Sequence, residues 1–389
     1  MRGVADKLHL SAISPGTAQS EIRAMTVECD RVGGVNLAQG VCDTEVPQPV
    51  AERAVEAIAQ GYNIYTRLDG IAPLRQAIAD KLAQHNGLSV DPDAEVQVTS
   101  GATGGFLAAS MALFDPGDEV VLFEPFYGYH LNTLRTLRVQ PVAVPLAAPD
   151  WTLDLDALRR AVTPRTRGMV INSPSNPSGK VFSRAELEAV AALAIEHDLF
   201  VITDEIYEYF VFGGAQHLSP ATLDGMAERT ITISGLSKTF SITGWRVGYL
   251  AADRRWMGAI RYFHDLVYVC SPSPFQYGAA AGLMQLSGSF YAALSAEYEA
   301  KRDLLCAALA DAGMRPHIPQ GAYYVLADAG VVPGATAREK ARNLLRETGV
   351  AAVAGTAFFA GGRGEDLLRF CFAKRDEDLQ TACKLLRGR

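Results

Sequence analysis

Between about residues 95 and 250, short β-branched segments alternate with longer segments of helical periodicity, and this alternation is the strongest constraint on the fold. The strand-like segments are EVQVT, DEVVLF, VQPVAVPL, RGMVIN, DLFVITD, RTITIS and WRVGYLAA. One connecting segment, SRAELEAVAALAIEHD, opens with Ser183 and Glu186 in capping-box spacing and continues with helical periodicity. We therefore expect an α/β fold with a mostly parallel central sheet covered by helices on both faces.

The last hundred residues have a different character. A long helical stretch, SFYAALSAEYEAKRDLLCAALADAG, is followed by short strands around GAYYVLAD and DLLRFCFA. A chain of 389 residues is long enough for two or three domains or one large domain with an appendage. We expect a large α/β domain over residues 46–285 and a smaller α+β domain formed by residues 1–45 and 286–389.

Composition argues against several classes of partner. The net charge is −7 and no dense run of Lys and Arg is present, so nucleic acid is not an expected partner. No stretch has the roughly 18 to 20 apolar residues of a membrane span, and the start has no apolar signal region, so we expect a cytoplasmic protein. No metal site is expected, because the six cysteines lack ligand spacing: Cys29, Cys42, Cys270, Cys306, Cys371 and Cys383.

The residues that follow each strand are candidates for a binding site, because ligands of open parallel sheets bind beyond the carboxyl ends of the strands. These exits read SGATGG, EPFY, NSPSNPSG, DEIY and SGLSK. SGATGG precedes the helical pattern FLAASMALF, which places free backbone N–H groups at a helix N-terminus where an anion is favoured. It matches neither a Walker A loop nor G-x-G-x-x-G, and a plain tight turn is the alternative.

Two charged residues at these exits suggest covalent chemistry. Lys238 follows a β-branched strand in a stretch that is poor in charge, where desolvation and the nearby Arg246 would lower the pKa of the amine and make it a nucleophile. Asp204 ends the apolar segment FVIT, where a carboxylate needs a cationic partner such as a protonated pyridine nitrogen. The alternatives are a solvated surface lysine and a helix N-cap aspartate.

A lysine for an aldehyde, an aspartate for a ring nitrogen and an anion cradle with an arginine together describe a site for pyridoxal 5'-phosphate (PLP). From about residue 40 to the C-terminus, the chain resembles the class I/II aminotransferases of PLP fold type I. The resemblance is carried, in order, by YTRLDGIAPLRQAIA, TSGATGGF, FEPFYGYH, NSPSNPSG, ITDEIYEYF, SGLSKTFSITGWRVGY and RFCFAKRDEDL. Its last two motifs are similar to the kynurenine and glutamine transaminase branch, near the aspartate and aromatic aminotransferases.

The resemblance implies a role for each matching residue at the cofactor ring. Lys238 would form the internal aldimine, and Asp204 would pair with the pyridine nitrogen. Tyr207 and Asn176 would hydrogen-bond the phenolic oxygen, and Tyr127 would stack on the ring. Lys238, Asp204 and Tyr207 are thus the expected catalytic residues.

The resemblance also implies a phosphate site. Its expected ligands are the backbone of Ala102 and Thr103, the side chains of Arg246 and of Ser234 or Ser237, and Tyr65 from a second subunit. Both serines remain candidates because Gly235 stands where relatives often have serine. The contact by Tyr65 implies a homodimer with shared active sites.

The substrate carboxylate has its own implied ligands. Arg369 in LLRFCFA matches the arginine that grips the substrate α-carboxylate through a bidentate fork, with Gly40 and Asn176 nearby. The alternative is a surface arginine at a strand end. Two positions depart from the family pattern, because Ser178 replaces the commoner threonine and Cys42 stands where many relatives have proline.

The resemblance implies transamination between an L-amino acid and a 2-oxo acid by a ping-pong mechanism. The main rival is a PLP-dependent lyase or β/γ-replacement enzyme of the same fold, which the local sequence does not separate from an aminotransferase. A ligand-sensing module would need room for a DNA-binding domain before residue 40, and an ordinary nucleotide-binding protein would need a G-x-G-x-x-G loop with a ribose-binding acid.

The identity of the amino acid is not determined by these motifs. No arginine is obviously assigned to a second carboxylate, whereas Tyr65, Tyr127, Tyr268 and the GAYY tyrosines are candidates for an apolar lining. The sequence therefore favours aromatic or other neutral amino acids, with Arg67 as a candidate ligand for an acidic one.

Overall fold

The computed structural model describes residues 10–11, 13–14 and 21–389 of the chain. Within this part of the chain, the largest sheet has eight strands in the order β2-β9-β8-β7-β6-β3-β4-β5. The strands are β2 (Val96–Ser100), β3 (Glu119–Glu124), β4 (Gln140–Ala147), β5 (Thr152–Leu153), β6 (Thr166–Asn172), β7 (Phe200–Asp204), β8 (Thr230–Gly235) and β9 (Val247–Ala251). Only β9 and the short edge strand β5 run antiparallel to their neighbours, which confirms the predicted mostly parallel sheet.

Helices cover both faces of this sheet because its strands are apolar on both faces. The covering helices are α3 (Ala72–Lys81), α4 (Gly101–Leu113), α5 (Gly128–Thr136), α6 (Leu155–Ala161), α7 (Arg184–Glu196), α8 (Arg254–Tyr268) and α9 (Ser273–Gln285), and α2 (Gln48–Ala59) packs on α9. Val120 and Ile202 pack with α4, α5 and α8 on one face. Val121 packs with α6 and α7 on the opposite face, where Val98 and Tyr249 pack with α3 and α9 at the other end of the sheet.

The start of helix α7 agrees with the prediction from the sequence. Helix α7 starts at the expected capping box, in which Ser183 Oγ accepts the Glu186 backbone N–H and the Glu186 carboxylate accepts the Ser183 N–H. The remaining short helices are η2 (Leu82–Asn86), η3 (Pro220–Thr222), η4 (Thr243–Trp245) and η5 (Gly355–Phe358). No described helix is both long and apolar enough to span a lipid bilayer.

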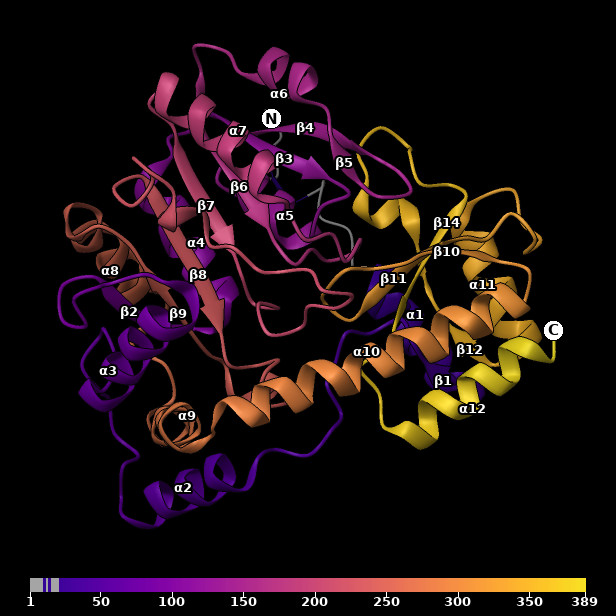
Figure 1. Cartoon of the computed structure of the whole chain (residues 1–389), viewed down its shortest axis with the longest axis horizontal. Coiled ribbons are helices and arrows are strands. Elements are labelled where there is room, and N and C mark those ends of the chain that lie inside the picture. The colour runs from indigo at the N-terminus through magenta and orange to yellow at the C-terminus, as the bar shows by residue number, and fades with distance from the viewer. Residues whose placement is uncertain (1–9, 12, 15–20) are drawn as a thin grey trace, which may run out of the picture.

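A second, antiparallel sheet lies in the C-terminal part of the chain (Figure 1). Its order is β10 (Arg315–His317), β11 (Tyr324–Asp328), β14 (Leu367–Cys371) and β13 (Val353–Ala354). The helices around it are α1 (Glu21–Val32), α10 (Gly288–Asp311), α11 (Ala337–Thr348) and α12 (Asp376–Arg387). Figure 1 shows the long helix α10 running from α9, near the central sheet, to this second unit.

The N-terminal segment packs with the C-terminal part of the chain. Strand β1 (Val35–Asn36) pairs in parallel with β12 (Val350–Ala351), and Met25 and Cys29 of α1 lie in the same hydrophobic core as Leu344 of α11. This packing supports a small domain built from both ends of the chain, and we retain 46–285 for the large domain and 1–45 with 286–389 for the small domain as a proposal.

Candidate active site

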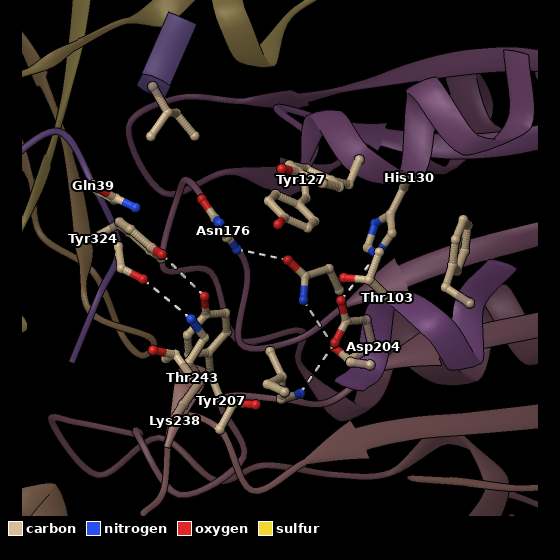
Figure 2. Close-up of a pocket in the computed structure, with 18 of the residues that line it drawn as sticks. Gln39, Thr103, Tyr127, His130, Asn176, Asp204, Tyr207, Lys238, Thr243 and Tyr324 are labelled. Carbon is tan, nitrogen blue, oxygen red and sulfur yellow. Dashed lines mark hydrogen bonds and ion pairs between the residues drawn. The ribbon is translucent and has the colours of Figure 1, made fainter. Parts of the chain in front are cut away.

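The carboxyl ends of the parallel strands meet a cavity of about 450 Å³ between the two sheets. Segments far apart in the sequence line it, including α1, the loop after β1, the starts of α4 and α5, and the exits of β6, β7 and β8. The expected site residues that line it are Gly40, Ala102, Thr103, Tyr127, Asn176, Asp204, Tyr207, Ser237, Lys238, Arg246 and Arg369. Figure 2 shows several of these side chains converging on one space.

Lys238 is half-buried in this cavity, so it is not a solvated surface lysine. Its ammonium Nζ donates a hydrogen bond to the Gly40 carbonyl at 3.2 Å and lies 5.6 Å from the centre of the Tyr323 ring. Burial lowers the pKa of Lys238 below its ordinary value of 10.5, and the charge of Arg246 lowers it further. A larger fraction of this amine is therefore neutral and nucleophilic near neutral pH than for an exposed lysine.

Asp204 is buried at the end of β7 and has two kinds of partner. Its Oδ1 accepts the Ile206 backbone N–H at 3.3 Å, much as a capping aspartate would, while its Oδ2 lies 3.0 Å from His130 Nε2 (Figure 2). The His130 ring is held on α5 between the rings of Phe106 and Tyr127, with centroid distances of 4.5 Å and 5.3 Å. The carboxylate is thus fixed in orientation at the cavity wall.

The sequence reasoning did not identify His130 as a site residue. The residue lies in the motif FEPFYGYH, three positions after Tyr127, which is the N-cap residue of α5, and the two rings meet edge to face. That i, i+3 spacing from a strand-exit tyrosine is the signal that would have found it. Its contact with Asp204, however, joins two elements 74 residues apart.

A network of amides connects the exits of β6 and β7. Asn172 Nδ2 donates to the Asp204 carbonyl at 2.9 Å, and Asn172 Oδ1 accepts the Asn176 N–H at 2.7 Å. Asn176 Oδ1 in turn accepts a hydrogen bond from Arg369 Nη1 at 3.0 Å. Asn172, which was not predicted, therefore holds the loop of Asn176 against the strand that carries Asp204.

Arg369 is almost fully buried on β14, with 1% of its surface exposed, and is not a surface arginine. Its guanidinium lies over the rings of Tyr324 and Phe358 at 4.3 Å and 4.8 Å, and another of its N–H groups donates to the Ala38 carbonyl. Its Nε has no hydrogen-bond partner among the described residues. A buried N–H without a partner in a cavity wall fits a carboxylate ligand, which satisfies both the charge and the donor.

Three tyrosines shape the middle of the cavity. Tyr207 Oη and Tyr324 Oη lie 3.2 Å apart, and Tyr127 stacks on Tyr129 with ring centroids 5.1 Å apart. Burial raises the pKa of Tyr127 and Tyr207 well above the ordinary value of 10, so both remain protonated and can donate hydrogen bonds at neutral pH. Gly40 must be glycine here, because a Cβ would lie 1.8 Å from Tyr324 Oη.

The N-terminus of α4 forms an anion cradle beside these groups. Gly101 has a φ of +69°, and a Cβ on it would lie 2.4 Å from Arg246 Nη2, so the guanidinium packs directly on the first turn of the helix. A Cβ on Gly248 would lie 2.6 Å from the Ala102 nitrogen, so this glycine lets β9 approach the same turn. Helix N–H groups and a guanidinium aimed at one space suit a phosphate.

The two candidate serines separate in the structure. Ser237 follows β8 and lines the cavity. Ser234 lies within β8, opposite Tyr249, and its hydroxyl donates to Glu208 Oε1 at 2.8 Å. Because successive strand residues point to opposite faces, Ser234 projects to the side packed by α3 and α9. The expectation that Ser234 holds the phosphate is therefore wrong, and Ser237 is the remaining candidate.

Three other expected residues do not line the cavity of their own chain. Tyr65 is 79% exposed in the loop after α2. Tyr268 packs against Gly104 of α4, and Arg67 pairs with Asp69 at 2.7 Å. Of the tyrosines expected near the substrate, Tyr127 and Tyr324 line the cavity.

Comparison with known proteins identifies a single family. The family model described as "Aminotransferase class I and II" matches residues 32–386. The chain is 41% identical to the probable N-succinyldiaminopimelate aminotransferase of Mycobacterium tuberculosis, with 93% of this chain and 94% of that protein covered. It is 35% identical to the aromatic-amino-acid aminotransferase 2 of Thermococcus litoralis, with 93% of each covered.

The fold agrees with this assignment. The solved structure of N-succinyldiaminopimelate aminotransferase from Mycobacterium tuberculosis superposes with a TM-score of 0.94 at 40% identity. The alignment covers 98% of this chain and 100% of that one, so both sheets and the cavity between them fall within the shared fold.

Proposed function

The chain belongs to the class I and II aminotransferases, which are PLP-dependent enzymes, and from this premise we propose that Lys238, Asp204 and Arg369 perform transamination of an amino acid in the cavity. One observation carries the proposal. An amine with a lowered pKa, a fixed carboxylate and a buried guanidinium with one unpaired N–H line one cavity, beside a helix N-terminus suited to a phosphate. Each of these groups can bind or react with one functional group of PLP or of an amino acid.

The cavity offers a residue of suitable charge or hydrogen-bonding type for each functional group of PLP. Arg246, Ser237 and the N–H groups at the start of α4 would hold the phosphate, and Lys238 would hold the aldehyde carbon. The Asp204 carboxylate would pair with the ring nitrogen, and the protonated Tyr207 with Asn176 would bind the phenolic oxygen. When bound, PLP supplies the conjugated ring that stabilises negative charge at the substrate α-carbon.

The protein's own groups then have distinct tasks. Lys238, as a neutral amine, removes the proton from the substrate α-carbon and returns a proton. His130 orients the Asp204 carboxylate, whose negative charge keeps the ring nitrogen protonated. Arg369 binds the α-carboxylate and so fixes the α-carbon near Lys238.

This proposal predicts ping-pong kinetics, with parallel double-reciprocal lines when an L-amino acid and 2-oxoglutarate or pyruvate are varied. The relatives reported above are both named aminotransferases, which favours amino-group transfer over elimination. A lyase would instead release pyruvate from a cysteine conjugate without any 2-oxo acid acceptor. Pyruvate release as the main activity would overturn the assignment of Lys238, Asp204 and Arg369 to transfer.

Substitution of Arg369 tests the carboxylate site. Arg369→Lys keeps the charge but loses the fork, and we expect KM for the amino donor to rise about 10- to 100-fold, because hydrogen bonds to charged groups contribute about 1.5–3 kcal/mol. Stopped-flow absorbance of the first half-reaction gives the substrate affinity directly. Arg315→Lys is the matched control, since Arg315 lies on the same sheet with its side chain on the surface. An unchanged KM in Arg369→Lys would remove Arg369 from the substrate site.

We also propose that the enzyme is a homodimer with shared active sites. Clusters of exposed apolar side chains mark interaction sites on soluble proteins. Helix α2 and the loop after it carry several such side chains: Val55, Ile58, Tyr62, Ile64, Tyr65 and Leu68. A second copy would cover this surface and would bring Tyr65 to the phosphate end of its partner's cavity.

The dimer proposal predicts that a substitution outside a chain's own cavity weakens PLP binding in the partner's cavity. Tyr65→Phe removes one hydroxyl that lies outside its own cavity, and we expect PLP to bind about 10- to 100-fold more weakly, because a hydrogen bond to a charged group contributes about 1.5–3 kcal/mol. Fluorescence titration of the apoprotein measures this affinity. Light scattering should give about twice the chain mass of 41.8 kDa. A monomer that binds PLP tightly would refute the shared site.

We place the enzyme in the cytoplasm as a further proposal. All six cysteines are free thiols, and five of them are buried, a pattern typical of proteins in reducing compartments.

A further inference from the structure

The proposed function leaves one charged residue of the cavity lining without a role. In that proposal, Arg246 holds the phosphate and Arg369 binds the substrate α-carboxylate. Lys238 acts at the α-carbon, and Asp204, oriented by His130, acts at the cofactor ring. The remaining charged residue that lines the cavity is Arg23 on α1.

The position of Arg23 is set by the packing of α1. Ile22, Arg23 and Thr26 share one face of the helix, which lines the cavity, while Met25 is buried in the core on another side. Two ion pairs tie α1 to α11, one between Glu21 and Arg338 and one between Glu28 and Arg342, the latter at 2.9 Å. The helix therefore presents Arg23 to the cavity as part of the folded structure.

Arg23 has no internal counter-ion. It forms no ion pair or side-chain hydrogen bond with any other described residue, in contrast to Arg338 and Arg342 of α11, which pair with α1. Among the described residues, the only carboxylate in the lining is that of Asp204, which pairs with His130. Arg23 is exposed to solvent and also lines the cavity, so its unpaired guanidinium is accessible to an anion that enters there.

Arg23 lies on the substrate side of the cavity. Arg369 donates to the Ala38 carbonyl, and the next residue, Gln39, accepts a hydrogen bond at 3.4 Å from Thr26, one turn along α1 from Arg23. A short segment thus joins the two arginines. In Figure 2, Gln39 and Tyr324 lie across the cavity from His130 and Asp204, which are at the cofactor end.

We propose that Arg23 binds an anionic group, a carboxylate, at the distal end of the substrate side chain, and that the enzyme prefers amino donors with a second carboxylate. The proposal rests on the proposed function, in which Arg369 holds the α-carboxylate. It departs from the preference for neutral or aromatic side chains that the tyrosine pattern suggested, because an unpaired arginine lines the cavity. Arg67, the arginine first considered for an acidic substrate, is paired with Asp69 and does not line the cavity.

The first experiment compares matched amino donors. L-2-Aminoadipate and L-norleucine have chains of equal length that end in a carboxylate and a methyl group, and glutamate with norvaline forms a shorter pair. The ratio of half-reaction rate constants, acidic over neutral, is measured by stopped-flow absorbance for wild type, Arg23→Gln and Arg23→Lys. We expect a ratio well above one for wild type in at least one pair, a fall of about 3- to 5-fold in Arg23→Gln, and partial recovery in Arg23→Lys, since ion pairs of exposed side chains contribute up to about 1 kcal/mol.

A second readout does not depend on turnover. Binding of glutarate and adipate, which carry no amino group, is measured by calorimetry against valerate and hexanoate of the same lengths. Arg23→Gln should weaken binding of the dicarboxylates about 3- to 5-fold and change binding of the monocarboxylates less than about 2-fold. Arg31→Gln is the control, because Arg31 is exposed on the same helix and does not line the cavity.

The outcomes separate this inference from the proposed function. Three results would overturn the role of Arg23 while half-reactions still occur. The acidic-to-neutral ratio could be unchanged in Arg23→Gln, the variant could lose affinity equally for dicarboxylates and monocarboxylates, or the wild type could lack a preference for acidic donors. An absence of any half-reaction with every donor would instead refute the proposed transamination.

Discussion

Lys238→Ala is expected to abolish amino-group transfer, with a fall in kcat of about 10⁴-fold, at the upper end of the contribution of a positioned acid–base group. The loss is large because the same amine both anchors PLP and moves the proton at the substrate α-carbon. Wild-type protein incubated with PLP should be yellow, whereas the variant should lack the absorbance of the lysine-bound form. The exposed Lys384→Ala on α12 is the control and should behave like wild type.

The covalent link to Lys238 is tested directly by mass spectrometry. Borohydride treatment of the PLP-loaded wild type should fix the cofactor mass on the peptide that contains Lys238. Since burial lowers the pKa of Lys238, the neutral amine predominates at pH values where an exposed lysine with a pKa near 10.5 is still charged. Reaction of the apoprotein with PLP should therefore reach its plateau at lower pH than reaction of an exposed lysine. A cofactor adduct on another lysine would contradict the assignment.

Asp204→Asn is expected to give the second-largest loss, at least about 100-fold in kcat, comparable with removal of one preorganised electrostatic group in other enzymes. The amide keeps the size of the side chain but removes the negative charge that holds a proton on the ring nitrogen. Steady-state rates and the absorbance maximum of the bound cofactor measure the two consequences. His130→Ala, which leaves the charge and removes only its orienting partner, should cost less than Asp204→Asn.

The order of these two effects is itself informative. If Asp204→Asn kept near wild-type kcat while His130→Ala lost most activity, the imidazole rather than the carboxylate would be the group that acts on the cofactor. Thermal unfolding of both variants controls for destabilisation, because Asp204 and His130 are both buried. The proposal requires that kcat of Asp204→Asn falls by more than the decrease in the fraction of folded protein.

Local sequence was enough for the elements whose signals are local. The capping box at Ser183 and Glu186 and the alternation of apolar strands with helices depend on neighbours a few residues away, and the structure follows both. Lys238 and Asp204 could also be identified early, because each follows a strand, and the exits of parallel strands meet at one edge of a sheet. The family motifs then connected these residues to PLP.

Other features depended on contacts that local pattern does not encode. The pairing of β1 with β12 and of His130 with Asp204 joins segments far apart in the chain. Ser234 and Ser237 were equivalent candidates until strand register showed that only Ser237 lines the cavity.

The sequence by itself therefore determined the α/β class, the family and the chemistry of the strand exits, because periodicity, capping and motif spacing are properties of neighbouring residues. Only the tertiary structure decided which side chains share the cavity. Arg23 belongs to a helix outside the central sheet, and it reaches the substrate side because ion pairs and core packing hold α1 against the C-terminal part of the chain. Such placement is a sum of long-range contacts, which no single stretch of sequence contains.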